Sequence, residues 1–265
     1  MKHILLRGSI SLGYEEEGSG IPLLLIHGNT GSHIWYERVM RIGGCRTIAP
    51  DMPNFGASSQ LEGPPDIGRY ADALHDFVSA LELGRPVILG HSLGGAVAMA
   101  LALRPDMSPR GLILVDSAPP SGLVTPASRH PLIERMRSER DTLSTALKAV
   151  VPTLEDPALF ERLVDEALRM APKAWVGNAE ALGAFDCRAS CGKARFPVLV
   201  LWGERDAIVT REMAESTAAA FPSSGLVVLE GIGHSPMVED PRRFADLVGE
   251  FARGPGAQNL EISIR

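Results

Sequence analysis

The stretch Val87-Ile88-Leu89-Gly90-His91-Ser92-Leu93-Gly94 sets the architecture of this chain. Three apolar residues typical of a buried strand lead into a G-x-S-x-G pattern, and an alanine-rich segment with helical periodicity follows. The pattern alone is weak, but strand, sharp turn and helix in this order form the context that a nucleophilic serine requires. Backbone N–H groups at the helix N-terminus can support developing negative charge there. We therefore predict that Ser92 is a nucleophile.

Similar apolar runs recur on both sides of this stretch and alternate with segments of helical periodicity. Such runs suit strands buried on both faces of a parallel sheet, and the alternation predicts crossover units. The chain is therefore expected to be an α/β protein with a mostly parallel, eight-stranded sheet flanked by helices. Strands are expected at residues 2–7, 10–16, 21–26, 46–49, 86–89, 111–115, 196–202 and 226–229, the first two as a hairpin. Helices are expected at 35–41, 66–83, 92–104, 211–221 and 241–252.

Residues 119–194 interrupt this rhythm, because prolines divide the interval and it contains no strand-like run. A loop this long without its own structure is uncommon, so the interval is predicted to be a helical cap. The catalytic core then consists of residues 1–118 and 195–265. Since the cap leaves one core strand and returns to another, it should lie over the carboxyl ends of the strands, where ligands bind in open parallel sheets. Its helices are expected at 132–140, 142–151, 157–170 and 175–185.

A serine hydroxyl needs a base to accept its proton. Of seven histidines, His234 directly follows the last apolar run and should emerge at the same sheet edge as Ser92. The base in turn needs an anion that fixes its tautomer. Asp206, in a loop after another strand, is the favoured acid, and Asp116, at the end of the preceding strand, is the competitor. Glu204 is more simply explained as a surface charge.

An oxyanion formed at this site would need two preorganised donors. One is expected to be the backbone N–H of Leu93, just after the nucleophile. The other should come from the loop after the strand at 21–26, with Asn29 N–H preferred and Thr30 as the alternative.

At this point the chain resembles the α/β-hydrolase superfamily, and specifically its serine esterases with a helical cap. The order Ser92, Asp206, His234 is that of the superfamily. Asp51-Met52-Pro53-Asn54-Phe55-Gly56 is similar to its D-x-P-G-x-G segment, with Asn54 in place of the usual glycine. Asn tolerates left-handed backbone better than most residues, so we expect this departure to affect a turn and not the chemistry. The resemblance runs from residue 9 to 253.

The resemblance implies acyl transfer, and ester hydrolysis is its most common outcome. Serine at position 92 excludes the haloalkane dehalogenases and epoxide hydrolases, which use an aspartate nucleophile. Hydrolysis of lactones stays open, as does cleavage of carbon–carbon bonds in ring-fission products. A different class also stays open, since some relatives with intact triads act as ligand receptors or signalling proteins.

The residues of the substrate pocket are less clearly marked. The candidates lie close to the site in sequence or in the cap, and they are His33, Trp175, Phe185, Met237 and Val238. For His33, Trp175 and Phe185, packing of helices or core is the more common role. Aromatic residues make up only 5% of the chain, and the cap holds just Phe160, Trp175 and Phe185. We therefore expect a small-to-medium acyl group and a small-molecule substrate.

Composition excludes other classes of partner. The net charge of −6 argues against nucleic-acid binding, and no apolar run is long enough for a membrane span. Three cysteines and no signal-peptide pattern in residues 1–7 predict a cytoplasmic protein. No cofactor or metal motif is present, Cys187 and Cys191 lacking further ligands nearby. Residues 260–264 alternate in polarity and could pair with an edge strand. Monomer and homodimer are not distinguished.

Overall fold

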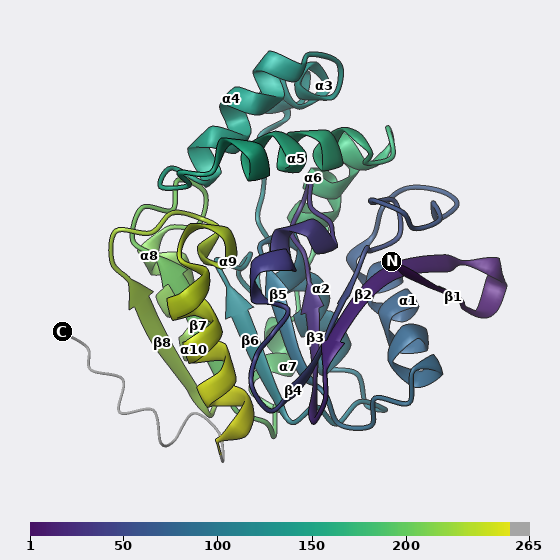
Figure 1. Ribbon diagram of the computed structural model, residues 1–265, viewed down its shortest axis with the longest axis vertical. Helices are drawn as coiled ribbons and strands as arrows, with labels where there is room; N and C mark the ends of the chain where they lie inside the picture. The colour runs from purple at the N-terminus through teal and green to yellow at the C-terminus, as the bar shows by residue number, and fades with distance from the viewer. Residues whose placement is uncertain (255–265) are drawn as a thin grey trace.

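The computed structural model describes residues 1–254 and has an eight-stranded sheet at its centre (Figure 1). The strands are β1 (Lys2–Leu5), β2 (Ser11–Gly18), β3 (Ile21–Ile26), β4 (Cys45–Pro50), β5 (Val87–His91), β6 (Gly111–Val115), β7 (Val198–Gly203) and β8 (Ser224–Leu229). Their order across the sheet is β1-β2-β4-β3-β5-β6-β7-β8. The eight expected strands are confirmed, with boundaries that shift by a few residues.

The sheet is antiparallel at one edge and parallel elsewhere. β1 pairs with β2 and β2 pairs with β4 in antiparallel register, whereas all pairs from β4 to β8 are parallel. The parallel strands β5, β6 and β7 are buried along their whole length, as expected for strands covered on both faces. The predicted strand at 260–264 lies outside the described residues.

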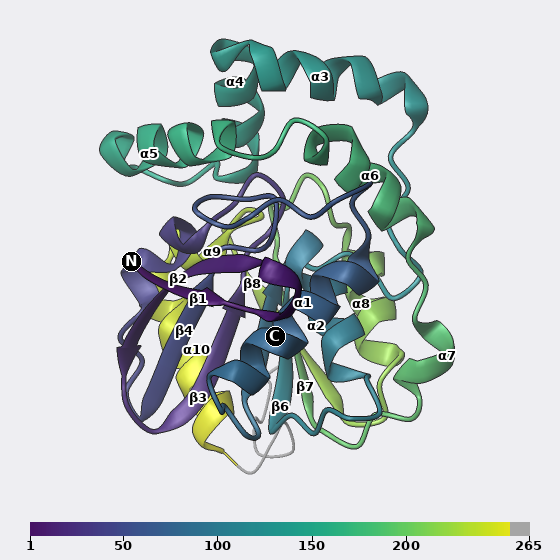
Figure 2. The same ribbon diagram turned by 90° about the vertical axis from the view of Figure 1, so that its right-hand side faces the viewer.

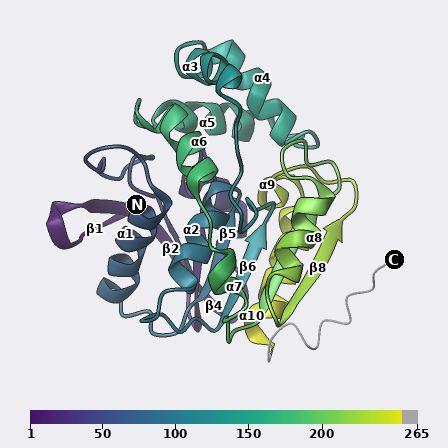
Figure 3. The same ribbon diagram turned by 180° about the vertical axis from the view of Figure 1, so that it is seen from behind.

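Helices cover both faces of the sheet. One face carries α10 (Pro241–Arg253), the short α9 (Pro236–Glu239) and the 3-10 helix η2 (His33–Val39), as Figure 1 shows. The opposite face carries α1 (Ile67–Ala80), α2 (Leu93–Ala102) and α8 (Arg211–Ala219), and Figure 3 views the molecule from this side. Almost every residue of α2 is buried, which matches its continuous apolar sequence.

Local sequence explains where several helices begin. Asp66 accepts a hydrogen bond from Arg69 N at 2.9 Å, and Thr210 accepts one from Met213 N at 3.3 Å, so each caps the helix that follows it. The helix expected at 35–41 forms instead as the 3-10 helix η2, beginning after Ser32. In a 3-10 helix, residues three apart lie above one another, which lets Tyr36 and Val39 share the buried side.

The chain between β6 and β7, which we call the helical segment, contains five α-helices and the short 3-10 helix η3 (Ala127–Arg129) among its described residues. The α-helices are α3 (His130–Ser138), α4 (Arg140–Val150), α5 (Pro157–Leu168), α6 (Ala174–Ala184) and α7 (Arg188–Cys191). Four of them match the expected helices, and α7 was not predicted. Figures 1 and 2 show α3 to α6 above the carboxyl ends of the strands, with α7 lower, beside the sheet. The helical segment therefore lies over the edge at which Ser92 is found.

Candidate active site

Ser92 sits in a strained turn between β5 and α2. Its backbone has φ 54° and ψ −118°, in the left-handed half of conformational space that side chains other than glycine rarely adopt. The turn is held because Ser92 N donates to Val115 O at 3.0 Å and Gly95 N donates to Ser92 O at 2.9 Å. Strain of this kind persists only where surrounding structure enforces it, and it is common at functional sites.

Glycines around Ser92 allow two chain segments, the end of β3 with its loop and the turn between β5 and α2, to meet. A Cβ at Gly28 would lie 2.8 Å from His91 Nδ1 and 3.0 Å from the Ser92 Cβ, which places the loop after β3 directly beside the serine. A Cβ at Gly94 would collide with the carbonyl oxygens of Ile26 and His27. The glycine-rich pattern around Ser92 is therefore a requirement for close backbone approach.

His234 and Asp206 form a buried pair at the same edge of the sheet. His234 Nδ1 bonds to Asp206 Oδ2 at 2.7 Å, and the two side chains are 4% and 0% exposed. The other carboxylate oxygen accepts from Ile208 N at 2.7 Å and Val209 N at 3.0 Å. Burial would raise the pKa of Asp206, but the bond to His234 and these N–H groups bring it below its usual value. Asp206 is therefore an anion that orients the imidazole.

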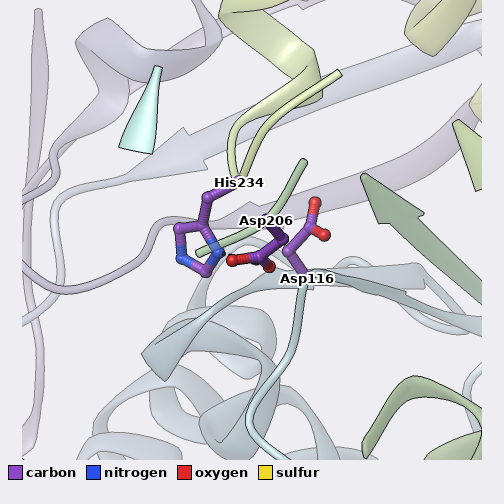
Figure 4. Close-up of side chains that lie close together, drawn as sticks. All are labelled: Asp116, Asp206 and His234. Carbon is purple, nitrogen blue, oxygen red and sulfur yellow. Dashed lines mark hydrogen bonds and ion pairs between the residues drawn. The ribbon is translucent and has the colours of Figure 1, made fainter. Parts of the chain in front are cut away.

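Asp116, the competing acid, lies beside Asp206 but has a different environment. Its Oδ1 accepts from Gly203 N at 2.8 Å, and its buried Oδ2 has no hydrogen-bond partner within residues 1–254. Burial, followed by the nearby charge of Asp206, raises the pKa of Asp116 well above its usual value. Figure 4 shows the Asp206 carboxylate directed at His234, with Asp116 on the far side of it. The imidazole thus pairs with Asp206, and the raised pKa of Asp116 favours its protonated form.

These three side chains are also the cluster that a metal could use. One donor atom from each of Asp116, Asp206 and His234 lies within 4.8 Å of the others. The imidazole nitrogen facing the carboxylates is already bonded to Asp206, so the arrangement matches an acid–base pair better than a metal centre. Cys187 and Cys191 bring their sulfur atoms to 3.6 Å from one another at α7.

His91 is a part of the site that the sequence analysis did not select. Burial lowers the pKa of its ring to about 3, so the ring is neutral. Since a carbonyl can only accept, His91 Nε2–H donates to His234 O at 2.8 Å, and the two rings lie 4.9 Å apart. The hydrogen bond from His91 therefore restrains the backbone of His234. Its position next to Ser92 in the G-x-S-x-G pattern was the available signal.

A second unpredicted residue, Glu239 in α9, holds the loop that carries His234. Its Oε2 accepts from Gly233 N at 3.1 Å and from Thr153 N and Oγ1 at 3.2 and 2.7 Å. Its Oε1 accepts from Ser235 N at 3.0 Å. One carboxylate thus joins the backbone on both sides of His234 to the helical segment.

The two proposed oxyanion donors lie on either side of Ser92. Leu93 is the first residue of α2, where a helix has no internal acceptor for its N–H groups. Asn29 lies in the loop that Gly28 brings against Ser92, and it is half-buried. Thr30, the alternative, follows with φ 57°. The placement is compatible with both donors, and their roles stay predictions.

The candidate pocket residues are placed differently from one another. His33 is engaged by Asp51, whose Oδ1 lies 2.8 Å from both its Nδ1 and its backbone N. Burial lowers the pKa of His33, but the hydrogen bond and the charge of Asp51, with smaller contributions from the charges of Glu166 and Glu15, together raise it above its usual value. Trp175 is 1% exposed, and Phe185, after α6, packs against the core. These contacts are what core packing requires.

Met237 and Val238 fall in α9, a helix that was not predicted, and both are almost fully buried. They follow His234 closely in the chain, since α9 begins two residues after it. Their contact with substrate stays a prediction.

The sheet order and the site at its carboxyl edge define an α/β protein of the hydrolase class. Residues 23–247 match the alpha/beta hydrolase family, and the chain belongs to that family. It is 28% identical to lipase 1 of Psychrobacter immobilis over 267 residues, covering 93% of this chain and 82% of the lipase. It is 29% identical to 2-hydroxymuconate semialdehyde hydrolase of Pseudomonas sp. strain CF600 over 270 residues, covering 93% and 92%.

Among solved structures, a thermophilic esterase from Thermogutta terrifontis superposes with a TM-score of 0.83. The sequences are 28% identical, and the match covers 95% of this chain and 97% of the esterase. Within residues 1–254, every helix is too short or too polar to cross a membrane. The fold and the family are thus established, and the chain is a hydrolase with esterase, lipase and carbon–carbon hydrolase relatives.

Proposed function

We propose that the protein hydrolyses carboxylic esters of small-to-medium acyl chains through an acyl-enzyme intermediate. The observation that carries this proposal is the strained Ser92 at the same sheet edge as the buried His234–Asp206 pair. A serine in that setting, with a base already oriented by an anion, is suited to nucleophilic attack on a carbonyl. The lipase and esterase relatives act on the same class of bond by their names.

The proposed reaction has two halves. Ser92 Oγ attacks the ester carbonyl while His234 accepts its proton, and Asp206 stabilises the imidazolium that forms. Backbone N–H groups of Asn29 and Leu93 stabilise the oxyanion. The alcohol leaves with the proton from His234. Water, deprotonated by His234, then attacks the acyl-enzyme and releases the acid and Ser92.

Residues 119–194 are proposed to act as a cap over this site, with residues 1–118 and 195–265 as the catalytic core. The position of α3 to α6 above the carboxyl edge supports this division (Figure 2). The cap is poor in aromatic residues, and Trp175 is buried in packing. Both points favour a modest acyl pocket and a small-molecule substrate.

Carbon–carbon bond hydrolysis is the second candidate, because the 2-hydroxymuconate semialdehyde hydrolase relative matches over nearly the full length of both chains. The loop His27-Gly28-Asn29-Thr30-Gly31-Ser32 favours the ester, since it lacks the G-G-G-P-G-like pattern expected for ring-fission hydrolases. Purified enzyme given both p-nitrophenyl esters and a ring-fission dienoate distinguishes the two.

The decisive test uses a fluorophosphonate probe and a series of p-nitrophenyl esters from acetate to palmitate. We expect the probe to label the wild type and not Ser92→Ala, and hydrolysis to be fastest for acetate to hexanoate. Ser92→Ala should melt close to the wild-type temperature and lose at least about 1000-fold in kcat. An unlabelled wild type, or Ser92→Ala within tenfold of the wild type, would refute the proposal. A maximum at palmitate would refute the acyl-size assignment alone.

A further inference from the structure

A continuous chain of hydrogen bonds runs from the loop after β4 to the loop beside Ser92, buried except for its part-buried last link. Leu61 N donates to Asn54 Oδ1 at 3.0 Å, and Asn54 Nδ2 donates to the Tyr70 hydroxyl at 2.9 Å. Tyr70 then donates to Asn178 Oδ1 at 2.8 Å, and Asn178 Nδ2 donates to Asn29 Oδ1 at 2.8 Å. We call the four side chains of Asn54, Tyr70, Asn178 and Asn29 the amide relay.

The direction of every bond in the relay follows from its first donor. A backbone N–H can only donate, so the oxygen of Asn54 faces Leu61 and its NH2 group faces Tyr70. Tyr70 must then use its own proton toward Asn178, because burial raises the pKa of its hydroxyl to about 12 and keeps it protonated. Asn178 consequently presents its NH2 group to Asn29. The polarity of the amide at Asn29 is set three side chains away.

Burial makes each link costly to break. Tyr70 and Asn178 are 0% exposed, and Asn54 is 2% exposed. The second N–H of Asn178 is directed to the sulfur of Met170, at 3.7 Å. Polar groups that are removed from water and lose their partner are destabilised by about 1–3 kcal/mol, so the relay has one favourable arrangement.

Asn54, which stands where the family pattern has glycine, contributes a side chain that the relay requires. Its φ of 75° is the left-handed conformation that the usual glycine would also adopt. Glycine has no side chain to accept from Leu61 or to donate to Tyr70. The backbone oxygen of Asn54 also accepts from Ala171 N, at 2.8 Å, in the helical segment. The relay therefore begins at a residue that the family pattern would not supply.

The far end of the relay is a loop under strain. Thr30 has φ 57°, which is rare for a β-branched residue, and its hydroxyl donates to Asn29 O at 2.6 Å. Gly31 N donates to Gly28 O at 3.2 Å and closes the turn. Asn29 itself is half-exposed. The local bonds act on its backbone, whereas the bond from Asn178 restrains its side chain from the helical segment.

We propose that Tyr70 in α1 and Asn178 in the helical segment are positioning residues that set Asn29, and with it a donor to the oxyanion. This inference rests on the proposed function, in which Asn29 N–H stabilises the oxyanion. The oxyanion exists only in the transition state and intermediate. Displacing its donor therefore lowers kcat and leaves ground-state binding largely unchanged.

The test compares Tyr70→Phe and Asn178→Leu, which keep ring or side-chain volume and remove the polar groups. We expect kcat for a p-nitrophenyl ester to fall about 10- to 100-fold, less than the loss of a complete oxyanion donor, with KM within about threefold. Thr217→Val is the matched control, because it removes one buried hydrogen bond, from Thr217 Oγ1 to Met213 O at 2.8 Å, in α8. Its kcat should stay within twofold of the wild type, at a similar loss of thermal stability.

Because the links act in series, the double variant Tyr70→Phe/Asn178→Leu should have nearly the kcat of the slower single variant. Multiplicative losses, a change confined to KM, or wild-type kcat in both single variants would overturn the inference while Ser92 labelling still stands.

A measurement that does not need turnover separates this inference from the proposed function. In 15N-labelled protein, Tyr70→Phe should shift the backbone amide signal of Asn29 and speed its hydrogen exchange, whereas Thr217→Val should not. An Asn29 signal identical to that of the wild type would overturn the relay, whatever reaction the enzyme performs.

Discussion

Two loops at the carboxyl edge of the sheet are tied to the helical segment in opposite ways. Four bonds converge on one carboxylate, Glu239: two from the loop after β8, which carries His234, and two from Thr153 in the helical segment. The loop after β3, which carries Asn29, is held through neutral side chains linked one after another. Parallel bonds to a charge tolerate the loss of one member, whereas a series fails at any link. The proposed base should therefore stay in place when one bond to Glu239 is lost. The proposed oxyanion donor should be displaced when any one link of the relay is lost.

Asp206→Asn should have the largest effect, because it removes the charge that orients His234. An amide that donates to Nδ1 stabilises the wrong tautomer, and such a change lowers kcat by about 10⁴. Steady-state hydrolysis of a p-nitrophenyl ester measures it. Asp116→Asn serves as the matched control at the neighbouring carboxyl, and its kcat should fall by less than tenfold. The assignment of the acid fails if the two variants exchange these values.

Glu239→Ala removes at once all four hydrogen bonds that its carboxylate accepts, from the histidine loop and from Thr153. Its effect is expected to rank second. Charge-assisted hydrogen bonds are each worth about 1.5–3 kcal/mol, and losses within one network do not add. We expect the free energy of unfolding to fall by about 2–4 kcal/mol and kcat by about 10- to 100-fold. Urea unfolding and ester hydrolysis measure the two effects. A stable variant with wild-type kcat would show that Glu239 does not hold the base.

The two adjacent carboxyl groups should give opposite dependences of stability on pH. The pKa of Asp116 is raised in the folded protein, so the folded state holds a proton that the unfolded chain loses above about pH 4. Asp116 therefore stabilises the fold less as the pH rises. The pKa of Asp206 is lowered, so its contribution is lost as the pH falls through the folded-state value.

Asp116→Asn keeps an acceptor for Gly203 N and removes the titration. The melting temperature of this variant relative to the wild type should accordingly increase from pH 5 to pH 8. Thermal denaturation in matched buffers checks this, and a difference that is constant or shrinks with pH would contradict a neutral Asp116.

Thr153→Val should have the smallest effect. It removes one of the four bonds to Glu239, and the backbone N–H of the same residue continues to donate. We expect a loss of at most about 1 kcal/mol in the free energy of unfolding and kcat within twofold. The contrast with Tyr70→Phe, which also removes one hydroxyl, compares a parallel tie with a serial one directly. Equal losses of kcat in the two variants would remove that contrast.

Much of the fold could be predicted from short-range sequence patterns. Apolar runs and their alternation with helical segments predicted all eight strands, since burial on both faces of a sheet leaves a clear signature. The short helices α7 and α9 were missed, because one turn of helix has too little periodicity to detect. The 3-10 form of η2 was missed for a related reason: apolar spacing over seven residues does not separate it from an α-helix. The cytoplasmic location stays a prediction.

For the site, the sequence was sufficient to select Ser92, His234 and Asp206, because each follows a recognisable strand and parallel strands end at one edge. The pairing of His234 with Asp206 and not with Asp116 has a cause that the sequence does not contain, and the role of Asp206 as the acid stays a prediction. Both follow strands, and only folding brings one carboxylate to His234 at 2.7 Å and encloses the other. Glu239, Tyr70 and Asn178 have no such marker, and each has at least one partner far away in the chain. Periodicity and motif spacing can be detected in a short stretch of sequence, because burial of one element selects apolar residues at regular positions. The pairing of polar groups depends instead on which distant segments meet in the folded protein.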